Sequence, residues 1–508
     1  MRVRSTLPAT TVSVGLSAVL LTGCFSSPEG GGSGGATATG GGGDRVSVAM
    51  LQPPRSGLTP FSDDAFKLSR WSTAETLVVL DGAGDAQPAL ATAWEQVDLR
   101  TWRFEVRRGV TFHDGTDLTA QQVAAVLTAA TLASPKPRIL DGVELTAEVD
   151  PADPAGAVLV RTGDADPLVP QRLSSPQLSI LSAAAYRPDG TVDPVGHGTG
   201  PFELVAVDGT SSATLDRYDG YWGEPARAAG IDVDFVPDGT ARAAALRTGT
   251  ADVVEAVPVS QAALLEEDQV FEVPMPRTNT LYLNTERGAF TDPALRAAAR
   301  EAIDREGVVE TVYEGRADVA QGLLGPALPW AAAGRPQRGE TPAGDPAGRE
   351  VVLATFTDRA ELPEVAVQLE QQLEAAGFTV RQEVREYAQI EADALAGAFD
   401  AFILSRATVL DSGDPVAYMY SDFACDGSFN IAQLCDPAID EALRTAAATP
   451  AGEARRAAVL AAERLVLQSD AAIPMLHERV IQGESGDFTG LARDSREREL
   501  VTAQTSPR

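Results

Sequence analysis

The 508-residue chain contains almost no lysine: Lys67 and Lys136 are the only two, and arginine supplies the other positive charges. No Gly-Lys pair occurs, which excludes the phosphate-binding loop of nucleotide hydrolases. The net charge is −31, with 72 acidic and 41 basic residues. This excess argues against nucleic acid as a partner, because phosphate binding needs clustered lysine and arginine. It is compatible with cationic or zwitterionic ligands, although its simplest explanation is a soluble surface.

Histidine is also scarce. One of the three histidines lies in the stretch TFHDGTDLT at residues 111–119. His113 has no histidine or cysteine near it in sequence, and His197 and His477 lack the spacing of metal ligands. Asp114 opens an Asp-Gly turn dipeptide between a predicted strand and a predicted helix. We therefore predict that His113 and Asp114 shape a turn, and we predict no metal site, no cofactor and no catalytic residue.

Long apolar runs are missing after the N-terminus. The single candidate, residues 7–21, follows a short basic start and is too short to span a membrane, so we interpret residues 1–23 as a signal peptide. It ends in Leu-Thr-Gly-Cys24, which resembles the bacterial lipobox, whose cysteine carries lipid in the mature protein. An ordinary secreted protein with an incidental cysteine is the alternative. Residues 24–44 are glycine-rich and predict a flexible tether.

The chain has only two further cysteines. With Cys24 lipidated, Cys425 and Cys435 are the remaining pair, and export makes a disulfide between them possible. Two buried free thiols are the alternative.

Strands and helices can be predicted along much of the chain. The stretch TWRFEVRRG places Trp102, Phe104 and Val106 on one face of a half-buried strand. A capping box at Thr119 predicts a helix that extends to about residue 132. Strands are also predicted at 45–51 and 231–236, and a helix at 292–303.

The clearest pattern begins at residue 351. Strands are predicted at 351–356, 379–384 and 399–404, separated by helices at 363–376 and 390–395. This alternation predicts an α/β fold with a parallel sheet and right-handed crossovers.

Two aspartates follow the last of these strands. Ligands of open parallel sheets bind beyond the carboxyl ends of the strands, which makes Asp411 and Asp414 candidate ligand-binding residues. Alternatively, both aspartates only form the turn around Gly413 and Pro415.

Several stretches resemble, in order, the blocks of one protein family. They are PALATAWEQVDLRTWRFEVRRGVTFHDGTDLTAQQV, GTGPFELV, LDRYDGYWG, LYLNTERGAFTDPALRAAAREAID and FNIAQLCDPAIDEAL. Over residues 45–482 the chain is similar to family 5 of the bacterial extracellular solute-binding proteins. These are the dipeptide, oligopeptide and nickel receptors of ABC importers.

The resemblance implies a two-lobed periplasmic-binding-protein fold of type II, cluster C, which closes over its ligand. Strands near 274–283 and 472–482 are expected to join the lobes. The implied boundaries are 45–80, 195–275 and 480–508 for the first lobe, 81–194 for a subdomain inserted in it, and 276–479 for the second lobe.

The resemblance also implies site residues. In peptide binders of the family, an aspartate in a D-x-x-[DE]-P segment pairs with the α-ammonium group of the ligand, and Asp411 holds that position here. Many members have tryptophan three residues earlier, where this chain has Thr408, which leaves ligand size and class open. Arg406 is a candidate partner for a ligand carboxylate, and Tyr418 is a further ligand-binding candidate.

The implied function is a receptor that captures peptides outside the membrane and delivers them to ABC permease subunits. The protein is expected to be a monomer, either lipid-anchored through Cys24 to the outer face of the cell membrane or periplasmic. Disulfide-bearing members place a cysteine pair near Cys425 and Cys435. A nickel-chelate or other small-solute receptor is the alternative within the family. A surface-anchored hydrolase is the alternative from another class, but no Ser/His/Asp arrangement and no H-E-x-x-H motif supports it.

Overall fold

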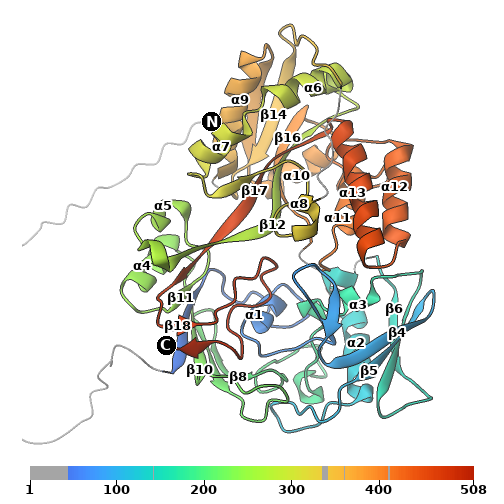
Figure 1. The fold of residues 1–508 in the computed structure, drawn as a ribbon, viewed down its shortest axis with the longest axis vertical. Helices are drawn as coiled ribbons and strands as arrows, with labels where there is room; N and C mark the ends of the chain where they lie inside the picture. The colour runs from blue at the N-terminus through green and yellow to red at the C-terminus, as the bar shows by residue number, and fades with distance from the viewer. Residues whose placement is uncertain (1–43, 141, 334–340, 360, 410–411) are drawn as a thin grey trace, which may run out of the picture. The chain divides into compact units, whose positions relative to one another are not determined.

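The computed structural model describes residues 44–140, 142–333, 341–359, 361–409 and 412–508. Within these residues, eleven strands form one large sheet in the order β15-β14-β16-β12-β17-β11-β1-β10-β9-β8, with β13 paired to β17 (Figure 1). Its strands are β1 (Arg45–Met50), β8 (Phe202–Asp208), β9 (Ser212–Arg217), β10 (Gly230–Phe235), β11 (Val253–Val254), β12 (Val270–Leu283), β13 (Ala317–Val319), β14 (Glu350–Phe356), β15 (Thr379–Arg385), β16 (Ala401–Ala407) and β17 (Ala472–Glu484).

Two long strands join the halves of this sheet. β12 has 14 residues and β17 has 13, and they pair with each other in antiparallel orientation. β12 also pairs with β16 in one half, whereas β17 also pairs with β11 in the other half. Figure 1 shows both strands running between the two halves. They lie where the sequence predicts the strands that connect two lobes.

The second half of the sheet confirms the predicted α/β pattern. β14 pairs in parallel with both β15 and β16, and the helices between these strands are α9 (Glu361–Ala375) and α10 (Tyr387–Leu395). In α9, Leu362, Val365 and Leu369 are fully buried on one face, which matches the helical spacing of apolar residues in the sequence. Each such side chain contributes roughly 1.5–3 kcal/mol by leaving water, so this face fixes the helix on the sheet.

The other helices surround the two halves of the large sheet. In the first half they are α1 (Ala65–Arg70), α4 (Gly239–Arg247) and α5 (Val259–Ala262). In the second half they are α6 (Pro293–Ala302), α7 (Arg305–Val312), α8 (Pro329–Ala333), α11 (Val416–Phe423), α12 (Pro437–Ala448) and α13 (Glu453–Gln468). The short 3-10 helices are η1 (Arg138–Leu140), η2 (Pro176–Leu178), η3 (Ala183–Ala185), η4 (Glu267–Gln269) and η5 (Gly288–Thr291).

A separate four-stranded antiparallel sheet lies within the first part of the chain. Its order is β4-β5-β7-β6, and its strands are β4 (Ala91–Asp98), β5 (Thr101–Val106), β6 (Leu145–Val149) and β7 (Ala157–Thr162). Helix α2 (Ala120–Leu132) begins after Thr119, whose side chain accepts a hydrogen bond from the Gln122 amide as the sequence predicts. Nearby are α3 (Val169–Arg172) and the pair β2 (Val78–Leu80) and β3 (Ala86–Pro88), whereas β18 (Phe488–Thr489) and β19 (Ser506–Pro507) pair near the C-terminus.

The stretch around His113 forms the predicted turn. The amide of Phe112 donates to the Thr116 carbonyl, and His113 Nε2 donates to the Gly200 carbonyl at 2.9 Å. The imidazole also packs against the ring of Tyr218. Burial lowers the pKa of His113 to about 4, so the ring is neutral at ordinary pH. His113 therefore links two chain segments, and the structural interpretation of this motif is confirmed.

The glycine-dense stretch GHGTGPFELV is also structural. A Cβ at Gly200 would lie 1.9 Å from the carbonyl oxygen of Ser72, so only glycine allows this backbone approach. Beside it, Thr199 and Trp222 donate hydrogen bonds of 2.8 and 2.9 Å to the buried carboxylate of Glu75. Two blocks of the family resemblance thus meet at one buried carboxylate.

Buried apolar side chains form separate clusters. The largest spans residues 281–476, a second spans 77–180, and a third combines 46–235 with Val253 and the C-terminal residues 488–501. The lobe boundaries given above stay predictions. None of the helices in the described residues is both long enough and apolar enough to cross a membrane.

Candidate ligand-binding site

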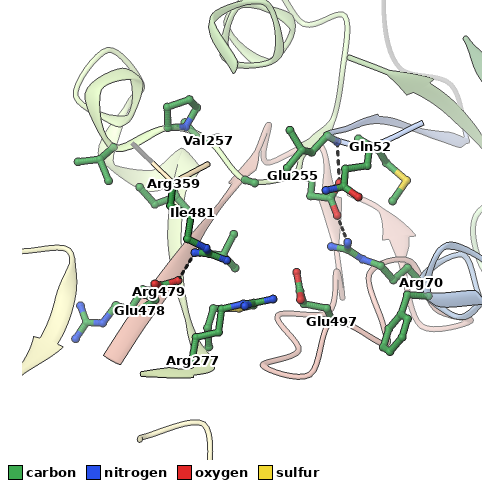
Figure 2. Close-up of a pocket in the computed structure, with 18 of the residues that line it drawn as sticks. Gln52, Arg70, Glu255, Val257, Arg277, Arg359, Glu478, Arg479, Ile481 and Glu497 are labelled. Carbon is green, nitrogen blue, oxygen red and sulfur yellow. Dashed lines mark hydrogen bonds and ion pairs between the residues drawn. The ribbon is translucent and has the colours of Figure 1, made fainter. Parts of the chain in front are cut away.

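A cavity of about 650 Å³ lies where the two halves of the large sheet meet. One wall comes from residues that follow the carboxyl ends of β1 and β11, and another from residues that follow β14. The crossing strands β12 and β17 form the floor between them (Figure 2). The volume falls within the roughly 300–1,000 Å³ of small-molecule sites, and the position agrees with the rule for ligands of parallel strands.

The cavity is rich in positive charge. Among the residues that the structure describes, eight basic ones line it: Arg55, Lys67, Arg70, Arg138, Arg277, Arg316, Arg359 and Arg479. Five acidic ones of the same described set line it: Asp63, Glu255, Glu361, Glu478 and Glu497. The excess of bases is opposite in sign to the charge of the whole chain, so the cavity wall is not simply a sample of the surface.

Most of these bases already have a carboxylate partner. The pairs are Lys67 with Asp64, Arg70 with Glu255, Arg138 with Asp63, Arg359 with Glu478, and both Arg316 and Arg479 with Glu272. In the described part of the chain, neither Arg55 nor Arg277 makes an ion pair. Arg55 is exposed to water, whereas Arg277 is half-buried.

An irregularity in β12 positions Arg277. The pairing of β12 with β17 shifts between Pro274 and Thr278, where three residues of β12 lie opposite a single residue of β17. Pro274 and Pro276 have no N–H to donate to the ladder, which favours such a bulge, and bulges redirect side chains. Figure 2 shows the Arg277 side chain extending across the cavity toward Glu497. Burial, and then the neighbouring Arg359 guanidinium, lowers the pKa of Arg277.

The acidic groups of the cavity differ in how firmly they are held. Glu478 accepts from Arg359 at 2.7 Å and from the Ser405 hydroxyl. Glu255 pairs with Arg70 and also accepts from the Leu51 amide at 2.8 Å. No such side-chain partner of Glu497 is found in the described residues, and its charge acts on both Arg70 and Arg277.

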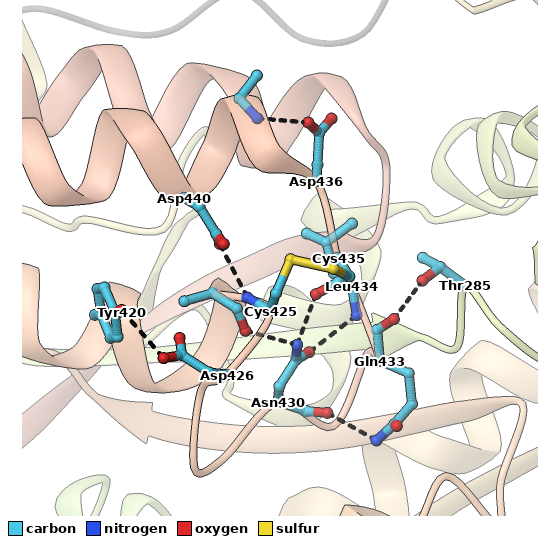
Figure 3. Close-up of a disulfide and its surroundings, with 12 residues drawn as sticks. Thr285, Tyr420, Cys425, Asp426, Asn430, Gln433, Leu434, Cys435, Asp436 and Asp440 are labelled. Carbon is cyan, nitrogen blue, oxygen red and sulfur yellow. Dashed lines mark hydrogen bonds between the residues drawn. A yellow bond between two sulfur atoms is a disulfide. The ribbon is translucent and has the colours of Figure 1, made fainter.

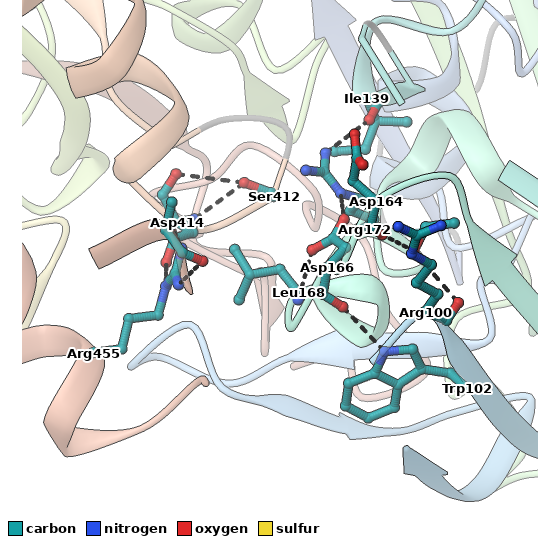
Figure 4. Close-up of polar contacts among 12 residues, drawn as sticks. Arg100, Trp102, Ile139, Asp164, Asp166, Leu168, Arg172, Ser412, Asp414 and Arg455 are labelled. Atoms are coloured by element: carbon teal, nitrogen blue, oxygen red, sulfur yellow. Dashed lines mark hydrogen bonds and ion pairs between the residues drawn. The ribbon is translucent and has the colours of Figure 1, made fainter. Parts of the chain in front are cut away.

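Asp414, predicted to bind ligand, lies outside this cavity. Its carboxylate pairs with Arg455, with Nε–Oδ2 at 2.6 Å and Nη2–Oδ1 at 3.0 Å, and also caps α11 through the Val416 amide (Figure 4). The cavity beside it has a volume of about 30 Å³, roughly the share of one water molecule in the liquid. A role for Asp414 in ligand binding stays a prediction.

Arg406 and Tyr418 are brought together, also outside the main cavity. Arg406 makes a bidentate ion pair with the fully buried carboxylate of Asp422, and its guanidinium lies 4.2 Å from the ring centroid of Phe429. The centroid of the Tyr418 ring lies 5.9 Å from the same guanidinium, and burial raises the pKa of the Tyr418 hydroxyl. In this arrangement the guanidinium already has an anion, so binding of a ligand carboxylate by Arg406 stays a prediction.

Thr408 contributes to the cavity indirectly. Its amide and its hydroxyl both donate to the carbonyl of Pro276, at 2.8 and 3.1 Å. Pro276 directly precedes Arg277, so Thr408 holds the irregular segment that carries this arginine. Its place in ligand binding was predicted from sequence position alone, and the contact gives it a specific physical role.

The disulfide between Cys425 and Cys435 is present, which decides against two free thiols. The loop that it closes is further held by Asn430, whose side-chain amide donates to the carbonyls of Ala424 and Leu434 (Figure 3). Asp411 and Cys24 lie outside the described residues, so their predicted roles stay predictions.

Arg277 is not among the residues predicted from the sequence, although a signal for it is present. The stretch Val-Pro-Met-Pro-Arg lies in the strand predicted to connect the lobes, and two prolines in a strand predict an interrupted ladder. A basic residue directly after such an interruption, between two lobes, is a reasonable candidate for a cavity residue. Whether this arginine is paired depends on carboxylates from distant segments, and the local sequence does not show which of them come close.

A cavity between two halves of a sheet joined by two long strands defines the class of two-lobed binding proteins. The fold of the nickel ABC transporter protein from Bacillus halodurans matches with a TM-score of 0.78 at 23% identity, over 91% of this chain and 99% of that protein. DppA from Helicobacter pylori, in complex with the peptide STSA, matches with a TM-score of 0.68 at 20% identity, over 92% and 98% of the chains.

Sequence comparison identifies the family. The glutathione-binding protein GsiB of Escherichia coli K12 is 25% identical over 413 residues, which are 77% of this chain and 80% of GsiB. The sequence model for the bacterial extracellular solute-binding proteins, family 5 Middle, matches residues 85–430. The chain therefore belongs to family 5 of the bacterial extracellular solute-binding proteins, and the predicted family and fold class are confirmed.

Proposed function

We propose that this chain is the receptor of an ABC importer that captures short peptides or peptide-like solutes outside the membrane. The observation that carries the proposal is the cavity of about 650 Å³, which takes its walls from both halves of the large sheet. A solute held there contacts both halves at once, so binding favours the form in which they are close together. The names of the relatives, which bind peptides and glutathione, support the same class of ligand.

Delivery and location follow from the same proposal. The protein hands its ligand to permease subunits, acts as a monomer without enzymatic activity, and is held on the outer face of the membrane by lipid on Cys24. A separate ATPase supplies the energy, because this chain has no phosphate-binding loop. Asp411 binds the α-ammonium group of the peptide.

The test combines ligand identification with titration. Mass spectrometry of solutes released from the purified protein should identify a peptide or a peptide-like compound, and calorimetry with that compound should give saturable binding. Asp411→Ala should weaken binding by about 2–5 kcal/mol, because the ammonium group loses its counterion.

The matched control is Asp219→Ala, which removes an exposed carboxylate that does not line the cavity. It should leave the affinity unchanged. Unchanged affinity in Asp411→Ala would remove the ammonium assignment. Release of a nickel chelate instead of a peptide would overturn the proposed ligand class.

A further inference from the structure

We propose that the central cavity selects solutes with an excess of carboxylate groups, and that Arg277 is the residue that determines this selectivity. The inference rests on the proposed function as a receptor for small solutes. It goes beyond that function by naming the charge class of the ligand and the residue that recognises it.

The first observation is the contrast in charge. The chain as a whole carries a net charge of −31, yet basic residues outnumber acidic ones on the cavity wall. On a protein with a net negative charge, the guanidinium groups of this wall that have no carboxylate partner among the described residues are a local place where an anion can bind. The overall composition is compatible with cationic or zwitterionic ligands, whereas the cavity wall points to an anionic one.

The second observation is that Arg277 lacks the partner that its neighbours have. Arg70, Arg359 and Arg479 each pair with a carboxylate in or beside the cavity. Within the described ranges, Arg277 makes no ion pair. The positive charge of Arg359, which follows β14, acts on it. A guanidinium cannot release its proton under ordinary conditions, so it stays charged and can form an ion pair with a ligand carboxylate.

The third observation is that the backbone fixes Arg277 before any ligand arrives. Two prolines interrupt the strand pairing immediately before it, and Thr408 holds the Pro276 carbonyl through two hydrogen bonds. A side chain presented by a rigid segment loses little freedom on binding, which favours specific recognition. A carboxylate meets the planar guanidinium through two parallel hydrogen bonds, which is the geometry that distinguishes it from a neutral group.

The acidic side chains of the cavity do not compete for this position. Glu478 and Glu255 are already bound by Arg359 and Arg70. Glu497 faces Arg277 across the cavity and is available to a ligand ammonium group (Figure 2). The arrangement therefore suits a solute with at least two carboxylates and one ammonium group, as in an acidic peptide, and the shared carboxylate chemistry also suits a non-peptide polycarboxylate.

The experiment compares probes of equal size and different charge. Calorimetry on the full-length protein, stripped of bound solute, uses Ala-Glu-Ala, Ala-Ala-Ala, Ala-Lys-Ala and citrate at about pH 7. Ala-Glu-Ala should bind at least about tenfold more tightly than Ala-Ala-Ala, and Ala-Lys-Ala should bind most weakly. Arg277→Gln should weaken binding of Ala-Glu-Ala by about 10- to 100-fold and reduce its advantage over Ala-Ala-Ala.

The comparison variant is Arg316→Gln. Arg316 lines the same cavity, but its partner Glu272 is also bound by Arg479, so the variant leaves no carboxylate unpaired. Because the charge of Arg316 is already paired in the protein, this variant should weaken binding of Ala-Glu-Ala less than Arg277→Gln does. The unliganded Arg277→Gln protein should melt at the same temperature as the wild type or higher, because an unpaired half-buried charge is removed.

Each outcome decides a separate point. Equal binding of acidic and neutral tripeptides overturns the selectivity, while the receptor function survives. Equal losses in Arg277→Gln and Arg316→Gln overturn the assignment to Arg277 and leave a diffuse positive field. Binding of citrate alone supports carboxylate selectivity and overturns the peptide ligand. Absence of binding by every carboxylate-rich probe overturns the inference.

Discussion

Two of the places where arginines lie among carboxylates differ in how the charges are completed. At the Asp414–Arg455 pair, both side chains are largely buried, and Arg455 also donates to the carbonyls of Ala446 and Thr449. In the central cavity, Arg277 is half-buried and forms no ion pair with any carboxylate that the structure describes. The complete network predicts a structural role, and the incomplete one predicts a ligand.

A third charged residue, Glu463, shows why an arginine without a carboxylate partner indicates a ligand. Glu463 is buried in α13, where the amides of Leu323 and Leu324 donate to its carboxylate. Burial raises its pKa to about 7, so it becomes neutral by taking up a proton. Arg277 cannot respond in this way, because arginine stays protonated. The difference between the two residues can be tested directly.

The largest effect is expected from breaking the complete network. Arg455→Met leaves the Asp414 carboxylate without its cation and removes the hydrogen bonds that Arg455 donates to three carbonyls. The free energy of unfolding should fall by about 3–5 kcal/mol, measured by urea denaturation. Ligand affinity, measured where the variant is folded, should be unchanged, because neither residue lines the central cavity.

Arg217→Met is the control for this variant, since Arg217 pairs with Asp219 at the surface. It should cost less than about 1 kcal/mol. If Arg455→Met kept its stability and lost affinity, Asp414 would belong to the ligand site, as the sequence analysis predicts.

An intermediate effect is expected from Glu463→Gln. The pKa of Glu463 is raised to about 7 in the folded protein from an ordinary value of 4.5. The folded state therefore holds a proton that the unfolded state releases. The stabilisation that this bound proton provides is complete below the ordinary pKa of 4.5 and is lost as the pH rises through about 7. At alkaline pH the glutamine variant should be more stable than the wild type by up to about 3 kcal/mol, and at acidic pH the two should be equal.

Denaturation at several pH values measures this difference. Glutamine retains the oxygen that accepts from Leu323 and Leu324, so the backbone contacts are preserved. Glu374→Gln, at an exposed position of α9, should show no pH-dependent difference. A constant offset at every pH would mean that Glu463 stays ionised in the folded protein.

The smallest effect is expected at the surface. Asp85, in the loop between β2 and β3, pairs with Arg456 of α13, and both side chains are partly exposed. Asp85→Asn should lower stability by less than about 1 kcal/mol. Because the pair bridges segments of different clusters, ligand affinity should also fall by a few-fold at low salt, and less at high salt. Calorimetry at a low and at a high salt concentration measures the loss of affinity under each condition.

Glu441→Gln tests whether location matters. Glu441 pairs with Arg444 inside α12, so this variant should change affinity at neither salt concentration. Equal responses of Asp85→Asn and Glu441→Gln would show that the bridging position has no influence on binding.

Much of the second half of the chain could be predicted, because its signals are local. Strand and helix periods between residues 351 and 404 identify β14, α9, β15, α10 and β16 to within three residues at each end. The cap at Thr119 and the turn at His113 were likewise predictable, since the partners of a cap or turn lie within a few residues. The site was harder, because the partners of Asp414, Arg406 and Thr408 lie 41, 16 and 132 residues away.

By itself, the sequence determined the α/β class and the parallel strands after residue 351 through periodicity, which the chain carries locally. The family, and with it the two long strands that join the halves, followed from the resemblance of several sequence blocks to that family. Only the tertiary structure decided which charges are paired. Whether an arginine is satisfied depends on carboxylates brought from distant segments, and that pairing gave Arg406 and Asp414 protein partners and left Arg277 facing the cavity.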